Sequence, residues 1–144
     1  MLVFSEYQTD TIDLALDFYG YEDCPKNYEF GPSFRDNFVL HFITKGKGVF
    51  HINKNEIHLE AGDLFLLPKN MVTYYQADAE DPWSYYWIGI SGTKVSDFMR
   101  FSTLHAKGFL KKNEVDTERI GLFMEQLVHK AEASKMTSHY QLHL

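Results

Sequence analysis

The chain has 144 residues, and its 14 basic and 20 acidic side chains give a formal net charge of −6 at pH 7. This length suits one domain with a substantial core, and the negative charge argues against a segment that grips the phosphate backbone of nucleic acid. The single cysteine, Cys24, excludes an internal disulfide and fits a reducing compartment. Because residues 1–10 do not resemble a signal peptide and no apolar run approaches the roughly 20 residues of a membrane span, we expect a cytoplasmic protein with no membrane partner.

The first part of the chain predicts mainly β structure. Residues 1–33 contain several glycines and prolines and no clear period, which favours an arm followed by a few short strands. Residues 38–44 are continuously apolar, Gly-Lys-Gly follows, and residues 49–53 resume as a strand, so we expect a hairpin here. Further strands are expected at 56–59, 64–67 and 72–77. Short strands at this spacing predict a closed barrel or a sandwich.

Residues 85–90 form the strand with the clearest two faces. Because side chains alternate along a strand, Tyr85, Trp87 and Gly89 should share one face, and the even-numbered residues should share the other. One face can therefore line a cavity while the opposite face packs.

After residue 92 the period becomes helical. Val95, Phe98, Met99 and Ser102 fall on one face of a first helix. Asp116 is the expected N-cap of a second helix, whose apolar stripe could cover the barrel or contact a partner and consists of Ile120, Phe123, Leu127 and Ala131. Ser138 has the character of a cap for a third helix, and we expect the natural protein to continue beyond residue 144.

The histidines do not have the spacing of a metal site. His51 and His58 could lie on neighbouring strands, but a metal-binding cupin typically has a His-x-His pair, and here only His41 precedes Gly46. Thr73 or Tyr74 stands where the last ligand would be, and hydroxyls are poor substitutes for imidazole. The sequence also lacks the Gly-x-Ser-x-Gly motif that positions a nucleophilic serine in hydrolases. We therefore expect no metal, no cofactor and no enzyme activity.

The aromatic residues are the strongest indication of function. Trp83, Tyr85, Tyr86 and Trp87 lie within five residues, and they could form a packed core, a dimer face or a site for a ligand with polar edges, such as a sugar. Arg35 could donate to such a ligand, although a lone arginine is more often solvated, here beside Asp36. Two other functions stay open: a metal-dependent cupin enzyme acting on a sugar or small acid, and a barrel that only oligomerises.

From about residue 20 to residue 92 the chain resembles the N-terminal effector-binding domain of AraC/XylS-type bacterial transcription regulators. The order and spacing of its motifs carry the resemblance: Gly31-Pro32, Arg35-Asp36, Leu40-His41-Phe42, Gly46-Lys47-Gly48, Gly62-Asp63-Leu64-Phe65 and Asp81-Pro82-Trp83-Ser84-Tyr85-Tyr86-Trp87. The resemblance implies a cupin-like jelly-roll barrel over residues 1–92 that has lost its metal ligands, with residues 93–144 as a helical tail of the same domain. It also implies a helix-turn-helix DNA-binding module outside this chain.

The resemblance also implies where an effector binds. The positions that match the family's pocket contacts are Arg35, Tyr75, Tyr85 and Trp87. The effector is expected to be a mono- or oligosaccharide, and Phe4 and Tyr7 of the arm are candidates to close over it. Ile120, Phe123 and Leu127 fall in the region through which such regulators form homodimers, and DNA would be bound only through the module outside this chain.

Overall fold

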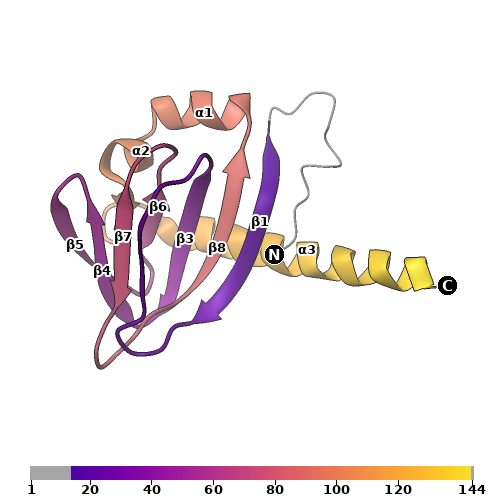
Figure 1. Ribbon diagram of the computed structural model, residues 1–144, viewed down its shortest axis with the longest axis horizontal. Helices are drawn as coiled ribbons and strands as arrows, with labels where there is room; N and C mark the ends of the chain where they lie inside the picture. The colour runs from indigo at the N-terminus through magenta and orange to yellow at the C-terminus, as the bar shows by residue number, and fades with distance from the viewer. Residues whose placement is uncertain (1–13, 144) are drawn as a thin grey trace.

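The computed structural model describes residues 14–143, with side chains described as far as residue 135. In this part of the chain, two antiparallel sheets face each other (Figure 1). The five-stranded sheet has the order β1 (Ala15–Asp23), β8 (Ser84–Ser91), β3 (Phe38–Lys45), β6 (Leu64–Leu67) and β9 (Phe109–Leu110). The four-stranded sheet has the order β2 (Glu29–Ser33), β7 (Thr73–Ala77), β4 (Lys47–Ile52) and β5 (Asn55–Glu60). The predicted mainly β jelly-roll is confirmed.

The predicted hairpin over residues 38–53 is wrong. β3 lies in the five-stranded sheet and β4 in the four-stranded sheet, so Gly46, with a φ of 75°, marks a crossing between sheets. The actual hairpin joins β4 to β5 through Asn53 and Lys54, whose φ angles are 52° and 65°. Positive φ at two successive residues is typical of the two-residue hairpin turn whose twist matches that of the strands. Such a turn is usually recognised in a sequence by a glycine. No glycine occupies this turn, so the sequence did not indicate the hairpin.

Each face of the five-stranded sheet packs against something. Between the two sheets lies an inner core that includes Phe50, Phe65 and Trp83, each with 0% exposure. On the other face lies an outer core that includes Leu64, Leu66 and Met124, which are also fully buried. All of β6 is therefore buried, which accounts for its continuously apolar sequence.

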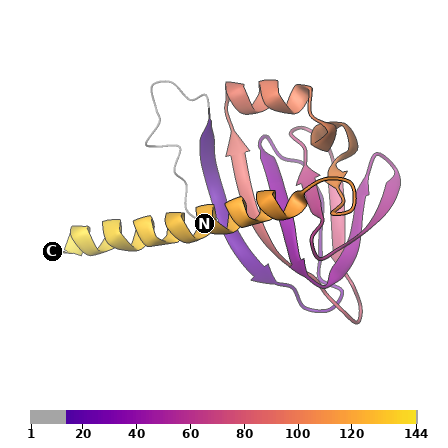
Figure 2. The same cartoon turned by 180° about the vertical axis from the view of Figure 1, so that it is seen from behind.

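Three helices within residues 14–143 lie outside the barrel: α1 (Thr93–Arg100), α2 (Thr103–Lys107) and α3 (Thr117–His143). Figures 1 and 2 show α3 crossing the outer face of the five-stranded sheet and continuing beyond β1. The predicted cap is confirmed, because the Asp116 carboxylate accepts a hydrogen bond from the Arg119 amide at 3.4 Å. A third helix starting at Ser138 is wrong, because α3 is continuous through that position.

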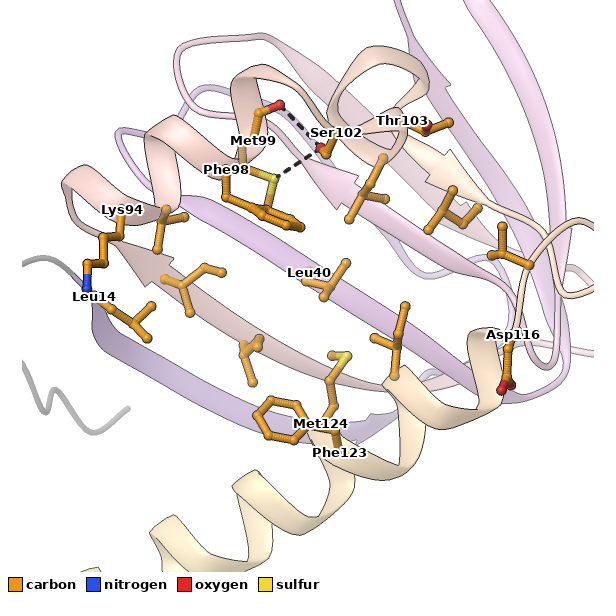
Figure 3. A pocket seen from close by; sticks show the side chains of 17 residues that line it. Leu14, Leu40, Lys94, Phe98, Met99, Ser102, Thr103, Asp116, Phe123 and Met124 are labelled. Atoms are coloured by element: carbon orange, nitrogen blue, oxygen red, sulfur yellow. Dashed lines mark hydrogen bonds between the residues drawn. The ribbon is translucent and has the colours of Figure 1, made fainter.

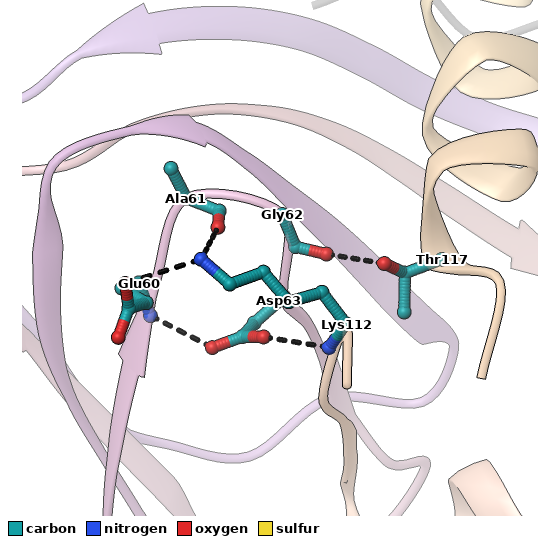
Figure 4. A network of polar contacts seen from close by, with 6 residues as sticks. All are labelled: Glu60, Ala61, Gly62, Asp63, Lys112 and Thr117. Atoms are coloured by element: carbon teal, nitrogen blue, oxygen red, sulfur yellow. Dashed lines mark hydrogen bonds and ion pairs between the residues drawn. The ribbon is translucent and has the colours of Figure 1, made fainter. Parts of the chain in front are cut away.

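The turn between β5 and β6 anchors the start of α3 (Figure 4). Asp63, 3% exposed, accepts hydrogen bonds from the amides of Glu60 and Lys112, both at 2.9 Å. The Thr117 hydroxyl donates to the Gly62 carbonyl at 2.6 Å. The motif Gly-Asp thus joins the barrel to the segment that leads into the long helix.

Candidate functional site

A cavity of about 190 Å³ opens between the two sheets, beside the inner core. Its walls include all four of the predicted pocket residues, which come from different parts of the fold. Tyr85 and Trp87 lie on β8, Tyr75 lies on β7 in the opposite sheet, and Arg35 lies in the connection between β2 and β3. The structure therefore brings these four side chains together. Their role in ligand binding stays a prediction.

The alternation predicted for β8 is confirmed. Tyr85 belongs to the inner core and Trp87 packs against it, whereas Ile88 belongs to the outer core, with Tyr86 and Ile90 packed on that side. Trp83, at the start of this aromatic run, is fully buried and stacks on Phe65 with ring centroids 5.1 Å apart. The run therefore serves as core at one end and as cavity wall at the other.

Strand register places Trp87 in a row with Gly20 and His41. On β8, Trp87 pairs with Gly20 of β1 on one side and with His41 of β3 on the other. A Cβ atom at position 20 would lie only 2.2 Å from Cζ2 of the Trp87 ring. Gly20 therefore lets the indole lie over β1, and this close approach fixes the ring as a wall of the cavity.

The tyrosine hydroxyls of the cavity remain protonated. Burial is the main cause that raises the pKa of both Tyr75 and Tyr85 above the ordinary tyrosine value. The two hydroxyls also influence each other's pKa, and so do Tyr85 and the thiol of Cys24. Burial raises the pKa of Cys24 to about 11, so the thiol is not a nucleophile at neutral pH. These groups can hydrogen-bond a ligand but carry no charge.

Arg35 is held between two aromatic rings. Its guanidinium carbon lies 5.5 Å from the centroid of Phe18 and 5.3 Å from that of Phe30. The backbone carbonyl of Arg35 accepts a hydrogen bond from the Asn70 amide at 2.7 Å. Among the described residues, no ion pair joins Arg35 to Asp36 or to any other carboxylate, and its buried Nε has no hydrogen-bond partner. Its charge is therefore available to the cavity.

His41 also lines this cavity, although it was not among the predicted pocket residues. It is 2% exposed and stacks on Phe65 with centroids 4.2 Å apart. Burial, helped by the nearby charge of Arg35, lowers the pKa of His41 to about 3, so the ring is neutral. Its Nδ1 has no hydrogen-bond partner in the described part of the chain. The pairing of His41 with Trp87 across β3 and β8 is the signal that identifies it.

Glu22 and Tyr28 also line the cavity and were not predicted. Glu22 pairs directly with Tyr85 across β1 and β8, so the two side chains point to the same side of the sheet. The sequence shows no clear strand period over β1, and without the position of β1 beside β8 Glu22 looks like any surface carboxylate. Only the register connects it to the site.

The other two histidines considered as metal ligands lie away from the cavity. His51 and His58 are on β4 and β5, with side chains 39% and 75% exposed, and each Nε2 lies about 4 Å from the carboxylate of Glu56. Within residues 14–143 no group of three or more histidine, cysteine or acidic side chains is placed to hold a metal ion. These histidines therefore give no support to a metal centre inside the barrel.

A second cavity, of about 620 Å³, lies outside the five-stranded sheet, among α1, α2 and the start of α3 (Figure 3). Its walls are almost wholly apolar and include Leu40, Phe98 and Met124, while Lys94 and Asp116 lie toward its two ends. A ligand rich in hydroxyl groups would find few partners there. The smaller inner cavity, with its donors and acceptors, is the candidate effector site.

The predicted dimerisation residues have two different environments. Ile120 and Leu127 are partly buried and pack on the outer core of their own chain, whereas Phe123 is 61% exposed. The apolar stripe of α3 therefore covers the barrel, and Phe123 is the member left available to a partner. The arm candidates Phe4 and Tyr7 lie outside the described residues.

Residues 15–143 match the family described as AraC-like ligand binding domain. The chain belongs to this family. It thus has the fold and the broad role that its motifs indicated, a ligand-binding domain of the AraC type.

Among curated relatives of this AraC-like domain, the Msm operon regulatory protein of Streptococcus mutans is 49% identical over 71% of the chain and 37% of its own length. The raffinose operon transcriptional regulatory protein of Pediococcus pentosaceus is 42% identical over 66% of the chain and 35% of its own length. The lactose operon transcription activator of Staphylococcus xylosus is 30% identical over 83% of the chain and 43% of its own length. The chain thus matches less than half of the length of each of these relatives.

The solved structures to which this chain is similar include a cupin domain. The Schizosaccharomyces pombe Cnp3 cupin domain is 15% identical, with a TM-score of 0.49 over 61% of this chain and 62% of that one. Over residues 14–143, no helix combines the length and the apolar character that a membrane crossing requires.

Proposed function

We propose that this chain is the effector-sensing domain of a DNA-binding transcription regulator, that it binds a sugar in the inner cavity, and that it is not an enzyme. One observation carries the proposal: Arg35, Tyr75, Tyr85 and Trp87 line a single cavity. Together they offer charged and neutral hydrogen-bond donors beside flat aromatic faces, which suits a ring with polar edges. Nothing in this set activates a nucleophile or water, so the chemistry available is binding.

The size of the cavity limits how much of an effector it encloses. Pockets for drug-sized ligands range from about 300 to 1,000 Å³, whereas this one measures about 190 Å³. We infer that the cavity encloses one sugar unit and that the remaining units of an oligosaccharide extend out of its opening. The relatives named for raffinose and lactose operons concern sugars that share a terminal galactose unit. A galactosyl group is therefore the first candidate for the enclosed unit.

Ligand binding in the inner cavity can affect α3 through β8, because the two faces of this strand contact different parts of the domain. Trp87 faces the cavity, while the preceding residue, Tyr86, faces α3 and its hydroxyl lies 3.3 Å from Nε2 of His129. A ligand that shifts β8 therefore shifts contacts with α3. Coupling between sites is typically about 1–3 kcal/mol, which suffices to change the arrangement of a dimer and its DNA-binding modules.

The test compares sugars that differ by the galactosyl unit alone. Raffinose is sucrose with galactose attached, and lactose differs from cellobiose only in having galactose in place of glucose as its terminal unit. We expect raffinose and lactose to raise the melting temperature and to give saturable binding by calorimetry, and sucrose and cellobiose to give neither. A saturating ligand at about 100 times its Kd should add about 2.7 kcal/mol of stability.

A variant then locates the site. Trp87→Ala should abolish binding while leaving the circular dichroism spectrum unchanged, and Phe98→Ala, which alters a residue of the outer cavity, serves as the matched control. Binding that survives Trp87→Ala but is lost in Phe98→Ala would place the effector outside the barrel. If none of the four sugars binds and the chain instead retains about one equivalent of iron, zinc or manganese, the cupin-enzyme alternative gains and this proposal fails.

A further inference from the structure

Two opposite charges line the inner cavity without pairing. Glu22 enters it from β1 and Arg35 from the connection before β3, and both side chains are half-buried. Neither forms an ion pair with any residue of the described chain, so they do not neutralise each other directly. Unpaired charges in a partly dehydrated wall are costly unless a ligand or water satisfies them. The cavity therefore presents one carboxylate and one guanidinium to whatever fills it.

The two charges act on different parts of the wall. The carboxylate of Glu22 contributes, after burial, to raising the pKa values of Cys24 and Tyr28. The guanidinium of Arg35 instead adds to the lowering of the pKa of His41, after burial, and opposes the rise that burial causes in the pKa of Tyr75. The cavity wall therefore carries one acidic and one basic group, together with an uncharged imidazole and uncharged tyrosine hydroxyls.

Such a wall discriminates between ligands by charge. An anionic ligand would gain from Arg35 but face Glu22, and a cationic ligand would meet the reverse. A neutral ligand with several hydroxyl groups satisfies both, because a hydroxyl donates to the carboxylate and another accepts from the guanidinium. Leaving such groups unpaired is the strongest source of specificity in a binding site.

We propose that Glu22 contacts the effector directly and that Glu22 and Arg35 together select a neutral sugar unit over its acidic and amino counterparts. This inference rests on the proposed function and sharpens it. It adds Glu22 to the residues expected to bind the effector and defines the effector as uncharged at the enclosed unit. Sugar phosphates and sugar acids are then excluded by charge, not by size alone.

The experiment uses ligands of matched size and different charge. Each charged ligand differs from neutral galactose at one position: galacturonate carries a carboxylate at C6, and galactosamine carries an ammonium group at C2. With the unmodified chain we expect galactose to bind at least tenfold more tightly than either charged analogue, measured by calorimetry or ligand-observed NMR. The Glu22→Gln variant should bind galactose about tenfold more weakly and should reduce the penalty against galacturonate. Glu80→Gln, which removes a carboxylate in an exposed turn, is the matched control and should change neither value.

The outcomes separate this inference from the function on which it rests. If lactose and raffinose bind but galacturonate binds as tightly as galactose, charge selection is refuted and sugar sensing stands. The same conclusion follows if Glu22→Gln binds galactose with unchanged affinity. The comparison of the three ligands on the unmodified chain does not depend on the variant folding. If no neutral sugar binds at all, the proposed function itself is refuted.

Discussion

His41 combines two properties that rarely occur together, complete burial and an ionisable ring without a partner for its Nδ1. Its aromatic contacts include the stacked ring of Phe65 and the edges of Tyr75 and Tyr85, at 5.3 and 4.9 Å. Protonation would place a second cation near Arg35 inside this aromatic environment. Burial first, and then Arg35, therefore lower the pKa of His41 to about 3. The imidazole is a neutral part of the wall at any physiological pH.

This shift predicts that the chain loses stability as the pH falls below about 6.5. Unfolded histidine takes up a proton near pH 6.5, while folded His41 does so only near pH 3, so between these values the unfolded state binds more protons. The free energy of unfolding should therefore decrease by up to about 1.4 kcal/mol per pH unit. Urea denaturation at pH 7, 6 and 5 measures this slope.

The pH range is chosen to isolate His41. The pKa values of Asp23 and Asp78 are lowered in the folded chain, so these two groups change the free energy of unfolding only where unfolded aspartate takes up a proton. Their contribution to the slope is therefore small above pH 5. His41→Leu should remove most of the slope, and His58→Gln, which alters an exposed histidine, should retain it. An identical slope in His41→Leu and in the unmodified chain would contradict the assignment.

At the level of single residues, sequence reasoning succeeded where one strand supplied a clear period. Tyr85 and Trp87 were placed on one face by alternation alone, and the structure puts that face toward the cavity. Glu22 and His41 could not be found in the same way. Each becomes part of the site only because β1 and β3 flank β8 in a particular register, and register is a long-range property that local patterns do not encode.

Among the elements, the turn between β5 and β6 is bonded to several distant parts of the chain. Its backbone also pairs with β3, because the Gly62 amide donates to the Ile43 carbonyl at 2.8 Å and the Ile43 amide donates to the Asp63 carbonyl at 3.0 Å. Together with Thr117, these bonds fix β3, β6 and the start of α3 to one another. A short motif of two residues thus determines where the long helix begins.

We expect Asp63→Ala to lower the free energy of unfolding by at least about 2 kcal/mol, because it leaves two backbone amides without an acceptor. Lys112→Ala is the matched control, because it keeps the amide of Lys112 and removes only exposed interactions of the ammonium group, an ion pair with Glu60 and a hydrogen bond to the Ala61 carbonyl. Exposed pairs are worth about 0–1 kcal/mol. Urea denaturation of both variants should give this order, and equal losses would show that the carboxylate of Asp63 is not the anchor.

Element assignment from sequence was correct for the positions of β3 to β8 and wrong for the pairing of β3 with β4. β6 was predicted with its observed limits. The helical face predicted to contain Val95, Phe98, Met99 and Ser102 is buried at Val95 and Met99, whereas Phe98 is 69% exposed. In a jelly-roll, however, successive strands alternate between sheets, and a short connection looks the same in sequence whether it closes a hairpin or crosses the barrel. β9 was missed because two residues are too few for a period to show.

For the whole molecule, the environments of the α3 residues predict which substitutions affect assembly and which affect folding. Phe123→Lys should weaken self-association at least tenfold by sedimentation and leave stability within about 0.5 kcal/mol, because the side chain is largely exposed. Leu127→Lys should instead lower stability by about 2 kcal/mol or more, because the leucine packs on the outer core.

Two results would contradict this prediction. If the chain sediments as a monomer at every concentration, or if Phe123→Lys associates like the unmodified chain, the dimer contact lies elsewhere. Thermal melts of both variants, recorded in the same buffer, separate a loss of association from a loss of folding.

The length of α3 beyond its anchor gives the domain a mechanical property. With 27 residues, the helix is about 40 Å long, and only its first part rests on the sheet (Figures 1 and 2). A tilt of about 5° at the anchored end displaces the far end by about 3.5 Å. Under the proposed function, the helix would convert small movements of β8 around a bound effector into displacements of a few ångströms at its far end.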